Sequence, residues 1–580
     1  MSHRRPGSNP RLRSEGWLGD PGKIGFIARS HLKTMGLDDD ELDGRPVVGI
    51  ANSFSELNPC NFHLRGLADA VKRGVREAGG LPLEFPTISP GEPLVRPGSM
   101  LLRNLMAIDI EETLCANPLD AVVLLASCDK TTPAQVMGAV SADLPTVLVT
   151  GGPMVPGRWR GVELGSGTDL WRLSEEVRAG RMALEELRDA ESHMHRSIGH
   201  CMTMGTASTM ACITEALGLQ LPGSATVPAV DARRLRFATA AGRRAVAMAL
   251  TGGPRPTELL TRDAFENAVR INAAIGGSTN AILHLLAIAG RAQVPLTLDD
   301  IDDWSREVPL LVDLKPSGQF LMDRFDEAGG LPAVLAELAP SLHLDALTVT
   351  GRTLGEEIRK AETHDREVIY TQADPVLPAG SATAVLRGNL APDGAVIKQS
   401  AASPELLRHR GPALVFDRIE DYLVAAEDPE LDVEPDTVLV LRNSGPRGYP
   451  GMPELGNLPL PVAMLKRGVT DMVRISDARA SGTAYGTIVL HVAPESAVGG
   501  PLALVRNGDP IMLDVAARRL DLEVSEAELT NRRTAQPQWS PPQQRGWQRM
   551  YVDHVLQADR GVDLDFLVGG SRAGLPRPPF

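Results

Sequence analysis

The chain has 580 residues, of which 43% are hydrophobic and 23% are charged, a balance typical of folded globular proteins. At about 150 residues per domain, this length predicts two to four structural units. The formal net charge of −14 argues against a nucleic-acid or anionic-membrane partner, because either would be repelled.

The first residues lack the pattern of a secretory signal. Residues 1–8 contain a paired arginine but no apolar run of about 7–15 residues follows them. No stretch approaches the roughly 18 apolar residues of a membrane span. Five cysteines, an odd number without a CxxC pair, fit a reducing compartment rather than a disulfide framework. We therefore expect a cytoplasmic protein.

The first third of the chain alternates segments of strand and helix character. Residues 46–50 and 121–126 are short apolar runs typical of strands, and residues 146–150 form another. Residues 63–78 carry apolar side chains at helical spacing, and a helix is expected to begin near Pro133. This alternation predicts an α/β domain with a largely parallel sheet and helices on both faces.

Three cysteines lie in loops that flank these elements. Cys60 and Cys128 each fall between a predicted strand and the next helix, where parallel sheets bind their ligands. Cys201 precedes a predicted helix over residues 206–219.

The predicted secondary structure changes in the second half of the chain. Residues 231–342 are helix-rich, with an apolar helix expected over 281–289, whereas short β-rich runs begin near residue 371. We predict an N-terminal α/β domain, 1–370, that carries the three cysteines, and a mainly β domain, 371–580. The β-rich runs are residues 384–386, 413–416, 437–441, 472–475, 487–492 and 511–515.

Three thiolates can hold an iron–sulfur cluster and leave one iron position without a protein ligand. An iron open in that way can act as a Lewis acid on a substrate. The spacing of Cys60, Cys128 and Cys201 is too long to indicate a cluster by itself, since a lone cysteine is often a small buried apolar residue. That is our interpretation of Cys115 and Cys212, which lie in helical patterns.

Oxygen donors form a second group of candidates. Glu92, Asp129 and Glu454 suit a hard cation such as Mg²⁺, which keeps water molecules that a substrate can displace. Taken singly, each carboxylate is more often a solvated or helix-capping residue, and Lys130 an ordinary surface cation. Ser481 follows a predicted strand, where a serine is usually a turn or cap residue.

Seven strings of the sequence resemble the dihydroxy-acid dehydratase and 6-phosphogluconate dehydratase family. They occur in order from about residue 45 to residue 515. Two of them, GPRGYPGMPE and DARASGTAYGT, are most similar to the sugar-acid branch, the pentonate dehydratases that act on L-arabinonate or D-xylonate. The other five strings are NPCNFH, SCDKTTPA, GHCMTMGTASTMA, AAIGGSTNA and HVAPESAVGGPLALVRNGD.

The resemblance implies an α/β/α N-terminal domain, a β-barrel-like C-terminal domain and an active site between them. It also implies that Cys60, Cys128 and Cys201 bind a 2Fe-2S cluster, with a 4Fe-4S cluster as the alternative.

Further roles follow from the same resemblance. It implies Mg²⁺ coordination by Glu92, Asp129 and Glu454 and by Lys130 as a carbamate, which turns a cation into an anionic oxygen ligand. Ser481 is implied as the catalytic base, with the Lys130 carbamate as the next candidate. His63, His200, Thr483 and Tyr485 are candidates for the pocket wall or for satisfied structural residues. Pro93, directly after Glu92, departs from the sugar-acid pattern and bears on the shape of the pocket.

The implied activity is that of a hydro-lyase that dehydrates a 2,3-dihydroxy sugar acid, an aldonate, to the 2-keto-3-deoxy acid. A homodimer or homotetramer is implied by the resemblance alone. The first alternative is a dihydroxy-acid dehydratase of branched-chain amino-acid biosynthesis, with the same chemistry and a more apolar pocket. The second is an iron–sulfur redox or sensor protein, which is disfavoured because a simple electron carrier closes all four positions with cysteine.

Overall fold

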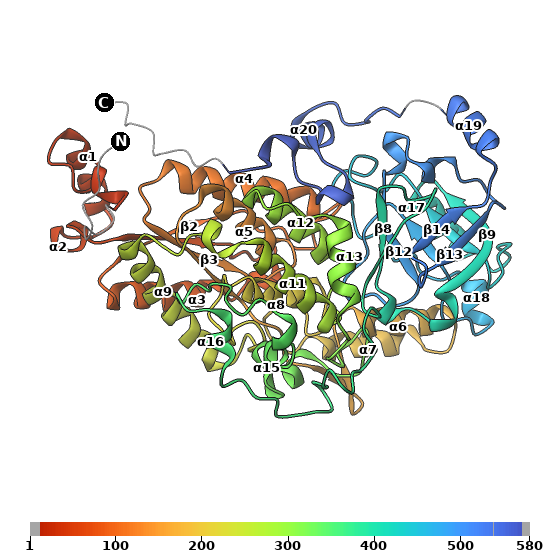
Figure 1. The fold of residues 1–580 in the computed structure, drawn as a ribbon, viewed down its shortest axis with the longest axis horizontal. Helices are drawn as coiled ribbons and strands as arrows, with labels where there is room; N and C mark the ends of the chain where they lie inside the picture. The colour runs from red at the N-terminus through yellow and green to blue at the C-terminus, as the bar shows by residue number, and fades with distance from the viewer. Residues whose placement is uncertain (1–11, 537–538, 571–580) are drawn as a thin grey trace.

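The computed structural model describes residues 12–536 and 539–570. The N-terminal half, red to green in Figure 1, lies at one end of an elongated molecule, and the β-rich C-terminal part, cyan to mid-blue, lies at the other. The last α-helix, α20 (Gly546–His554), returns to pack against the N-terminal half (Figure 1). Within the described part of the chain, no helix combines the length and the apolar character that crossing a membrane requires.

Four parallel strands form the first sheet in the order β2-β1-β3-β4. Every residue of β1, β3 and β4 is buried, as expected of a parallel sheet with both faces covered. The predicted α/β architecture is therefore confirmed. The bounds are β1 (Val47–Asn52), β2 (Leu81–Pro86), β3 (Ala121–Ala126) and β4 (Thr146–Thr150).

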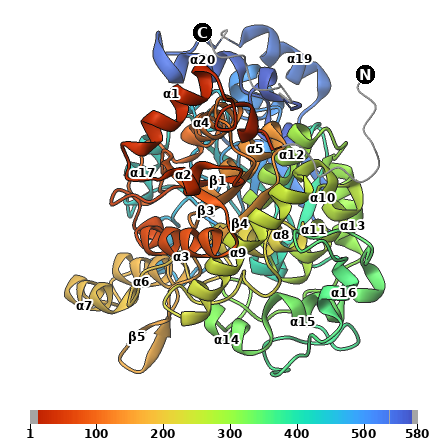
Figure 2. The ribbon, with the colours of Figure 1, turned by 90° about the vertical axis from the view of Figure 1, so that its left-hand side faces the viewer.

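Helices cover both faces of this sheet (Figure 2). On one face α3 (Leu64–Glu77) packs against α9 (Ala232–Thr251), and on the other α4 (Met100–Ala116) packs against α5 (Thr131–Ala142). The first pair approaches closely because a Cβ on Gly74 would lie 1.9 Å from the Thr239 carbonyl oxygen. Any larger residue at this position would force the two helices apart.

Eight strands form a second sheet in the order β14-β13-β9-β10-β11-β12-β8-β7. The two edge strands meet, because the Arg387 amide donates to the Arg518 carbonyl and the Leu520 amide to the Arg387 carbonyl, both at 2.9 Å. The sheet thus nearly closes, and the barrel-like prediction is confirmed. The bounds are β7 (Ala384–Leu386), β8 (Gly394–Ile397), β9 (Arg408–Phe416), β10 (Val438–Leu441), β11 (Arg474–Ser476), β12 (Ile488–Ala493), β13 (Pro510–Asp514) and β14 (Arg519–Leu522).

The C-terminal part contains more helix than the mainly β prediction implied. Strands β9 to β12 run parallel to one another, and parallel neighbours need crossover connections rather than hairpins. Two of these crossovers contain α17 (Ile419–Ala426) and α18 (Val462–Lys466). Two further helices, α19 (Glu526–Ala535) and α20 (Gly546–His554), follow the last strand.

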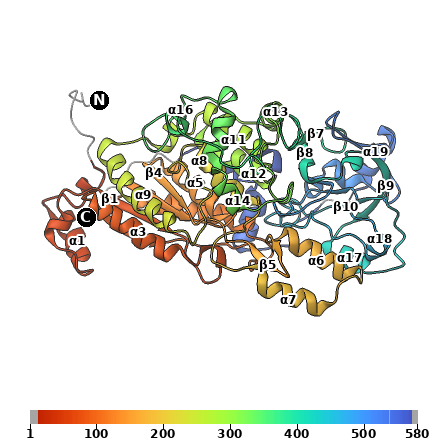
Figure 3. The same ribbon diagram turned by 90° about the horizontal axis from the view of Figure 1, so that it is seen from below.

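A small lobe projects from the N-terminal half toward the C-terminal part (Figure 3). It comprises the hairpin of β5 (Gly157–Trp159) and β6 (Val162–Leu164) with α6 (Thr168–Arg178) and α7 (Leu184–Met194). We call residues 157–194 the α6–α7 lobe. It has a hydrophobic cluster of its own, formed by Leu164, Leu173, Ala190 and Met194.

The remaining α-helices belong to the N-terminal segment and to the middle segment of the chain. Those near the N-terminus are α1 (Lys23–Lys33) and α2 (Asp39–Leu42). Those of the middle segment are α8 (Thr206–Ala216), α10 (Pro256–Leu259), α11 (Arg262–Ala274), α12 (Asn280–Ala292), α13 (Leu298–Arg306), α14 (Met322–Glu327), α15 (Gly330–Glu337) and α16 (Leu354–Ile358).

Candidate active site

A cavity of about 1010 Å³ collects nearly all the candidate residues that the sequence analysis singled out. Its walls come from segments between Cys60 and Ala207 and from segments between Tyr449 and Thr483, so both halves of the molecule contribute. The candidates that line it are Cys60, Glu92, Cys128, Asp129, Cys201, Glu454 and Ser481.

The three cysteines meet because their loops lie at one edge of the first sheet. Cys60 follows β1 and Cys128 follows β3, and these strands are neighbours in the sheet. Cys201 joins them through the loop in which His200 pairs with Pro153 beyond the end of β4. Neighbouring parallel strands place their following loops side by side, which explains the convergence.

The environment of the thiols suits metal ligation. Contact with the Cys60 thiol, together with burial, raises the pKa of the Cys128 thiol well above its usual range. Burial and the proximity of Cys60 raise the pKa of Cys201 to about 12. Such thiols stay protonated unless a metal stabilises their thiolates. The chain's other two cysteines lie on helices, Cys115 on α4 and Cys212 on α8, so three soft donors with no fourth fit a cluster that keeps one iron position open.

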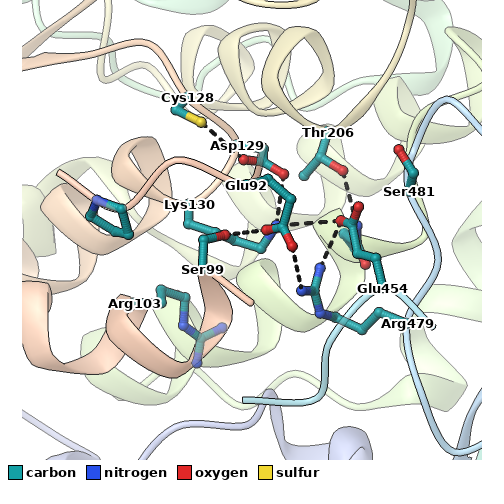
Figure 4. Close-up of polar contacts among 12 residues, drawn as sticks. Glu92, Ser99, Arg103, Cys128, Asp129, Lys130, Thr206, Glu454, Arg479 and Ser481 are labelled. Carbon is teal, nitrogen blue, oxygen red and sulfur yellow. Dashed lines mark hydrogen bonds and ion pairs between the residues drawn. The ribbon is translucent and has the colours of Figure 1, made fainter. Parts of the chain in front are cut away.

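The three carboxylates form a second cluster beside the thiols (Figure 4). Glu92, Asp129 and Glu454, here called the carboxylate cluster, can each place an oxygen within 4.8 Å of the other two. Burial and the neighbouring Glu92 raise the pKa of Glu454 to about 7. Carboxylates held this close repel one another, and a hard cation with oxygen ligands relieves that repulsion. The donor set therefore fits Mg²⁺.

Lys130 lies in the middle of the carboxylate cluster. Its side chain is fully buried, and Nζ is 2.7 Å from Asp129, 3.2 Å from Glu92 and 3.6 Å from Glu454. Burial acts to lower the pKa of Lys130, but the three carboxylates raise it overall. The surface-cation interpretation of Lys130 is therefore excluded, and its nitrogen is placed where an added oxygen donor would face the same cation.

Two residues that the sequence analysis did not single out hold the carboxylate cluster. Arg479, fully buried, donates from Nη1 to Glu454 at 3.0 Å and lies 3.8 Å from Glu92. Asn280, at the start of α12, donates from Nδ2 to Glu454 at 3.1 Å and to the Ala480 carbonyl at 3.0 Å. Two features of the sequence could have identified them. Arg479 is a charged residue in a turn of small residues, and Asn280 is an amide residue at the start of an apolar helix.

Ser481 lies on the opposite side of the carboxylate cluster from Cys128 (Figure 4). Its Oγ is 2.9 Å from Oγ1 of Thr483. The next residue, Gly482, lets this loop approach the first turn of α8, because a Cβ there would lie 2.6 Å from the Thr206 amide nitrogen. The positive end of the α8 dipole therefore faces the serine loop.

Of the four candidates for the pocket wall, two line a cavity and two do not. Thr483 lines the cavity, and Tyr485 lines a neighbouring cavity of about 380 Å³, where its hydroxyl donates to Glu175 at 2.8 Å. His63 and His200 do not line either cavity. Burial lowers the pKa of His63 to about 4 and that of His200 to about 3, which favours the neutral form of both.

Comparison with known proteins agrees with this geometry. Residues 45–357 match the family model for the dihydroxy-acid/6-phosphogluconate dehydratase N-terminal domain, and residues 367–562 match that for the C-terminal domain. An L-arabonate dehydratase of Azospirillum brasilense is 54% identical over 98% of this chain and 99% of its own length. A 6-deoxy-6-sulfo-D-gluconate dehydratase of Pseudomonas putida is 47% identical over 98% of both chains.

A relative named for another substrate is more distant. The dihydroxy-acid dehydratase of Ignicoccus hospitalis is 43% identical over 93% of this chain and 97% of its own length. Family models that span most of the chain, together with full-length relatives well above 30% identity, establish the membership. The chain therefore belongs to the dihydroxy-acid/6-phosphogluconate dehydratase family, and it is a dehydratase, a hydro-lyase.

Proposed function

We propose that the protein dehydrates a 2,3-dihydroxy sugar acid, an aldonate such as L-arabinonate or D-xylonate, to the 2-keto-3-deoxy acid. The observation that carries the proposal is the convergence of three thiols, three carboxylates and a serine on one cavity. Relatives named for L-arabonate and for 6-deoxy-6-sulfo-D-gluconate, at 54% and 47% identity, are more similar to this chain than a dihydroxy-acid dehydratase at 43%, which supports the choice of a sugar acid. A relative named for D-xylonate is 40% identical, so the identities favour L-arabinonate over D-xylonate.

Two inorganic groups belong to this proposal. Cys60, Cys128 and Cys201 would hold a 2Fe-2S cluster, since thiolates are the soft ligands that such clusters use. The carboxylate cluster and a carbamate on Lys130 would hold Mg²⁺ through hard oxygen ligands. When bound, these groups supply Lewis acidity toward the leaving C3 hydroxyl and toward the carboxylate and C2 hydroxyl of the substrate.

The chain's own residues supply the proton chemistry. Ser481 Oγ takes the proton from C2 of the substrate while the C3 hydroxyl leaves, and the resulting enol tautomerises to the ketone. A serine hydroxyl is a weak base, so its ionised form needs positive potential nearby. The N-terminal turn of α8 approaches the serine loop and supplies it.

A substrate panel tests the proposal. The purified protein should convert pentonates to 2-keto acids, measured as a carbonyl-specific adduct, faster than it converts 2,3-dihydroxyisovalerate. The reverse preference would identify the enzyme of branched-chain amino-acid synthesis instead. Absence of any elimination, with reversible reduction of the bound iron, would identify a redox protein.

We also propose that the protein assembles as a homodimer or homotetramer in solution. Light scattering coupled to size-exclusion chromatography would give the mass directly. A monomer mass across the concentration range used for assays would contradict it.

A further inference from the structure

We propose that Trp171, His195 and Tyr449, here called the outer wall of the cavity, form a subsite for the hydroxyl-bearing tail of the substrate. This inference rests on the proposed function, because it assumes that the carboxyl end of a sugar acid lies at the carboxylate cluster. The part of the substrate beyond C3 must then extend away from the cluster along the cavity wall.

The three side chains come from two separate parts of the chain and line the same cavity as Ser481. Trp171 lies on α6 within the α6–α7 lobe, and His195 is the first residue after the lobe, directly following α7. Tyr449 lies in the loop that leads from β10 to Glu454. The wall therefore joins the lobe to the segment that carries a member of the carboxylate cluster.

The polar tips of these side chains have no protein partner. Among the described residues, neither the Trp171 indole nitrogen, nor the ring nitrogens of His195, nor the Tyr449 hydroxyl makes a hydrogen bond. Trp171 is 38% exposed, His195 is exposed and Tyr449 is half-buried, so these tips face the solvent of the cavity and are open to a ligand. Residues of the same types elsewhere in the lobe are paired. The Trp159 indole donates to Asp189 at 2.7 Å, and His193 Nδ1 lies 2.8 Å from the Asp189 carbonyl oxygen.

A sugar-acid tail matches this wall chemically. Tryptophan and tyrosine offer an apolar ring face to the C–H groups of a polyol and a polar tip to its hydroxyls. A neutral histidine can donate and accept at once, as a hydroxyl can. Val95, Leu170 and Leu455, which line the same cavity, supply further apolar surface for the carbon chain.

An alkyl tail bound here would displace water from these polar tips and offer them no hydrogen bond in exchange. A site built to hydrogen-bond a substrate hydroxyl rejects an analogue that lacks it more strongly than a hydrophobic pocket rejects a small change in size. The wall therefore favours polyhydroxylated acids over branched-chain dihydroxy acids.

The test compares substrates that share the reacting carbons but differ in the tail. D-glycerate has only the 2,3-dihydroxy acid unit, whereas L-arabinonate and D-xylonate add two hydroxyl-bearing carbons. In His195→Phe, Tyr449→Phe and Trp171→Phe, kcat/KM for the pentonate should fall about tenfold each, mainly through KM. The value for D-glycerate should stay within about twofold of the wild type.

A matched control is available in the same lobe. His193 lies two residues before His195, is exposed and does not line the cavity, so His193→Phe should leave both substrates unaffected. If D-glycerate reacts too slowly to measure, calorimetric binding of each acid to Ser481→Ala, with and without His195→Phe, gives the same comparison.

The outcomes separate this inference from the proposed function. Equal losses for both substrates, or no loss for the pentonate, would overturn the subsite. A wild-type enzyme that ignores every aldonate and dehydrates 2,3-dihydroxyisovalerate would refute the proposed function instead.

Discussion

Single side chains decide how the carboxylate cluster is held together. Arg479 is the one guanidinium within 4 Å of both Glu92 and Glu454 among the described residues, and its Nε also donates to the Met452 carbonyl at 2.7 Å. It therefore compensates the charge of two carboxylates and ties their segment to the serine loop. Removing one partner of a buried ion pair leaves an uncompensated charge, which costs more than the pair itself contributes.

We expect Arg479→Met to lower the free energy of unfolding by about 3–5 kcal/mol in metal-free protein. Saturating Mg²⁺ should restore part of this loss, because a bound cation replaces the missing charge and stabilises the folded state. Urea unfolding with and without Mg²⁺ measures both effects. Arg181→Met is the control, since its ion pair with Glu176 is exposed. An equal loss at all Mg²⁺ concentrations would contradict the charge-compensation role.

Ser481→Ala tests the assignment of the base. The variant should retain iron, Mg²⁺ and substrate binding, yet lose orders of magnitude in kcat, because no other side chain would take the C2 proton. Exchange of the C2 hydrogen with D₂O, followed by NMR, should also stop. If exchange continued at a near wild-type rate, the Lys130 carbamate would become the base.

At the scale of whole elements, the order of the first sheet creates the thiol site. The sequence predicts the strands before Cys60 and Cys128 to within two residues, and it predicts that each is followed by a helix. It does not predict that β1 and β3 are neighbours, since pairing between distant strands leaves no periodic signal. The resemblance to a known family, rather than spacing, brought the three cysteines together.

Cys128→Ser should remove the visible charge-transfer absorption and the iron of anaerobically purified protein, which we expect at roughly two irons per chain. Cys212→Ser is the matched control, because Cys212 is a fully buried cysteine on α8 that does not line the cavity. Elemental analysis measures the iron content, and the visible absorption spectrum measures the charge-transfer bands. Full iron retention in Cys60→Ser, Cys128→Ser and Cys201→Ser alike would refute the cluster.

The limits of sequence reasoning are plain in the second sheet. Short apolar runs located six of its eight strands and missed β8 and β14. Such runs look alike in parallel and antiparallel sheets, so the crossover helices α17 and α18 were missed as well. The polar contacts of the site were missed for a related reason. Asn280 reaches Glu454 across 174 residues and the Ala480 carbonyl across 200, and local pattern carries no information over such separations.

At the scale of the whole molecule, a lysine side chain is buried away from the candidate active site. Lys398 follows β8, and its Nζ makes no hydrogen bond within the described residues. Burial lowers the pKa of Lys398 to about 7. Because the unfolded chain keeps the ordinary value of 10.5, it binds the proton more tightly than the folded protein. Between pH 7 and pH 10.5 the free energy of unfolding should therefore rise with pH.

Lys398→Met should abolish this rise, which amounts to about 4 kcal/mol across the interval, and should stabilise the protein most below pH 7. Urea unfolding at several pH values provides the measurement. Lys466→Met, which removes an exposed lysine at the end of α18, is the control and should leave the pH dependence unchanged. A parallel curve for wild type and Lys398→Met would show that the lysine is charged in both states or in neither.

The contact between the edge strands β7 and β14 affects the tendency of the chain to aggregate before it is fully folded. A free sheet edge presents unpaired backbone groups that can recruit a strand from another molecule. In the finished fold the two hydrogen bonds at Arg387 cover part of both edges of the eight-stranded sheet at once. Since Arg519 is 132 residues further along the chain than Arg387, a nascent polypeptide exposes the β7 edge for as long as that interval takes to be synthesised. Aggregation during translation, rather than instability of the finished enzyme, is the hazard that this architecture creates.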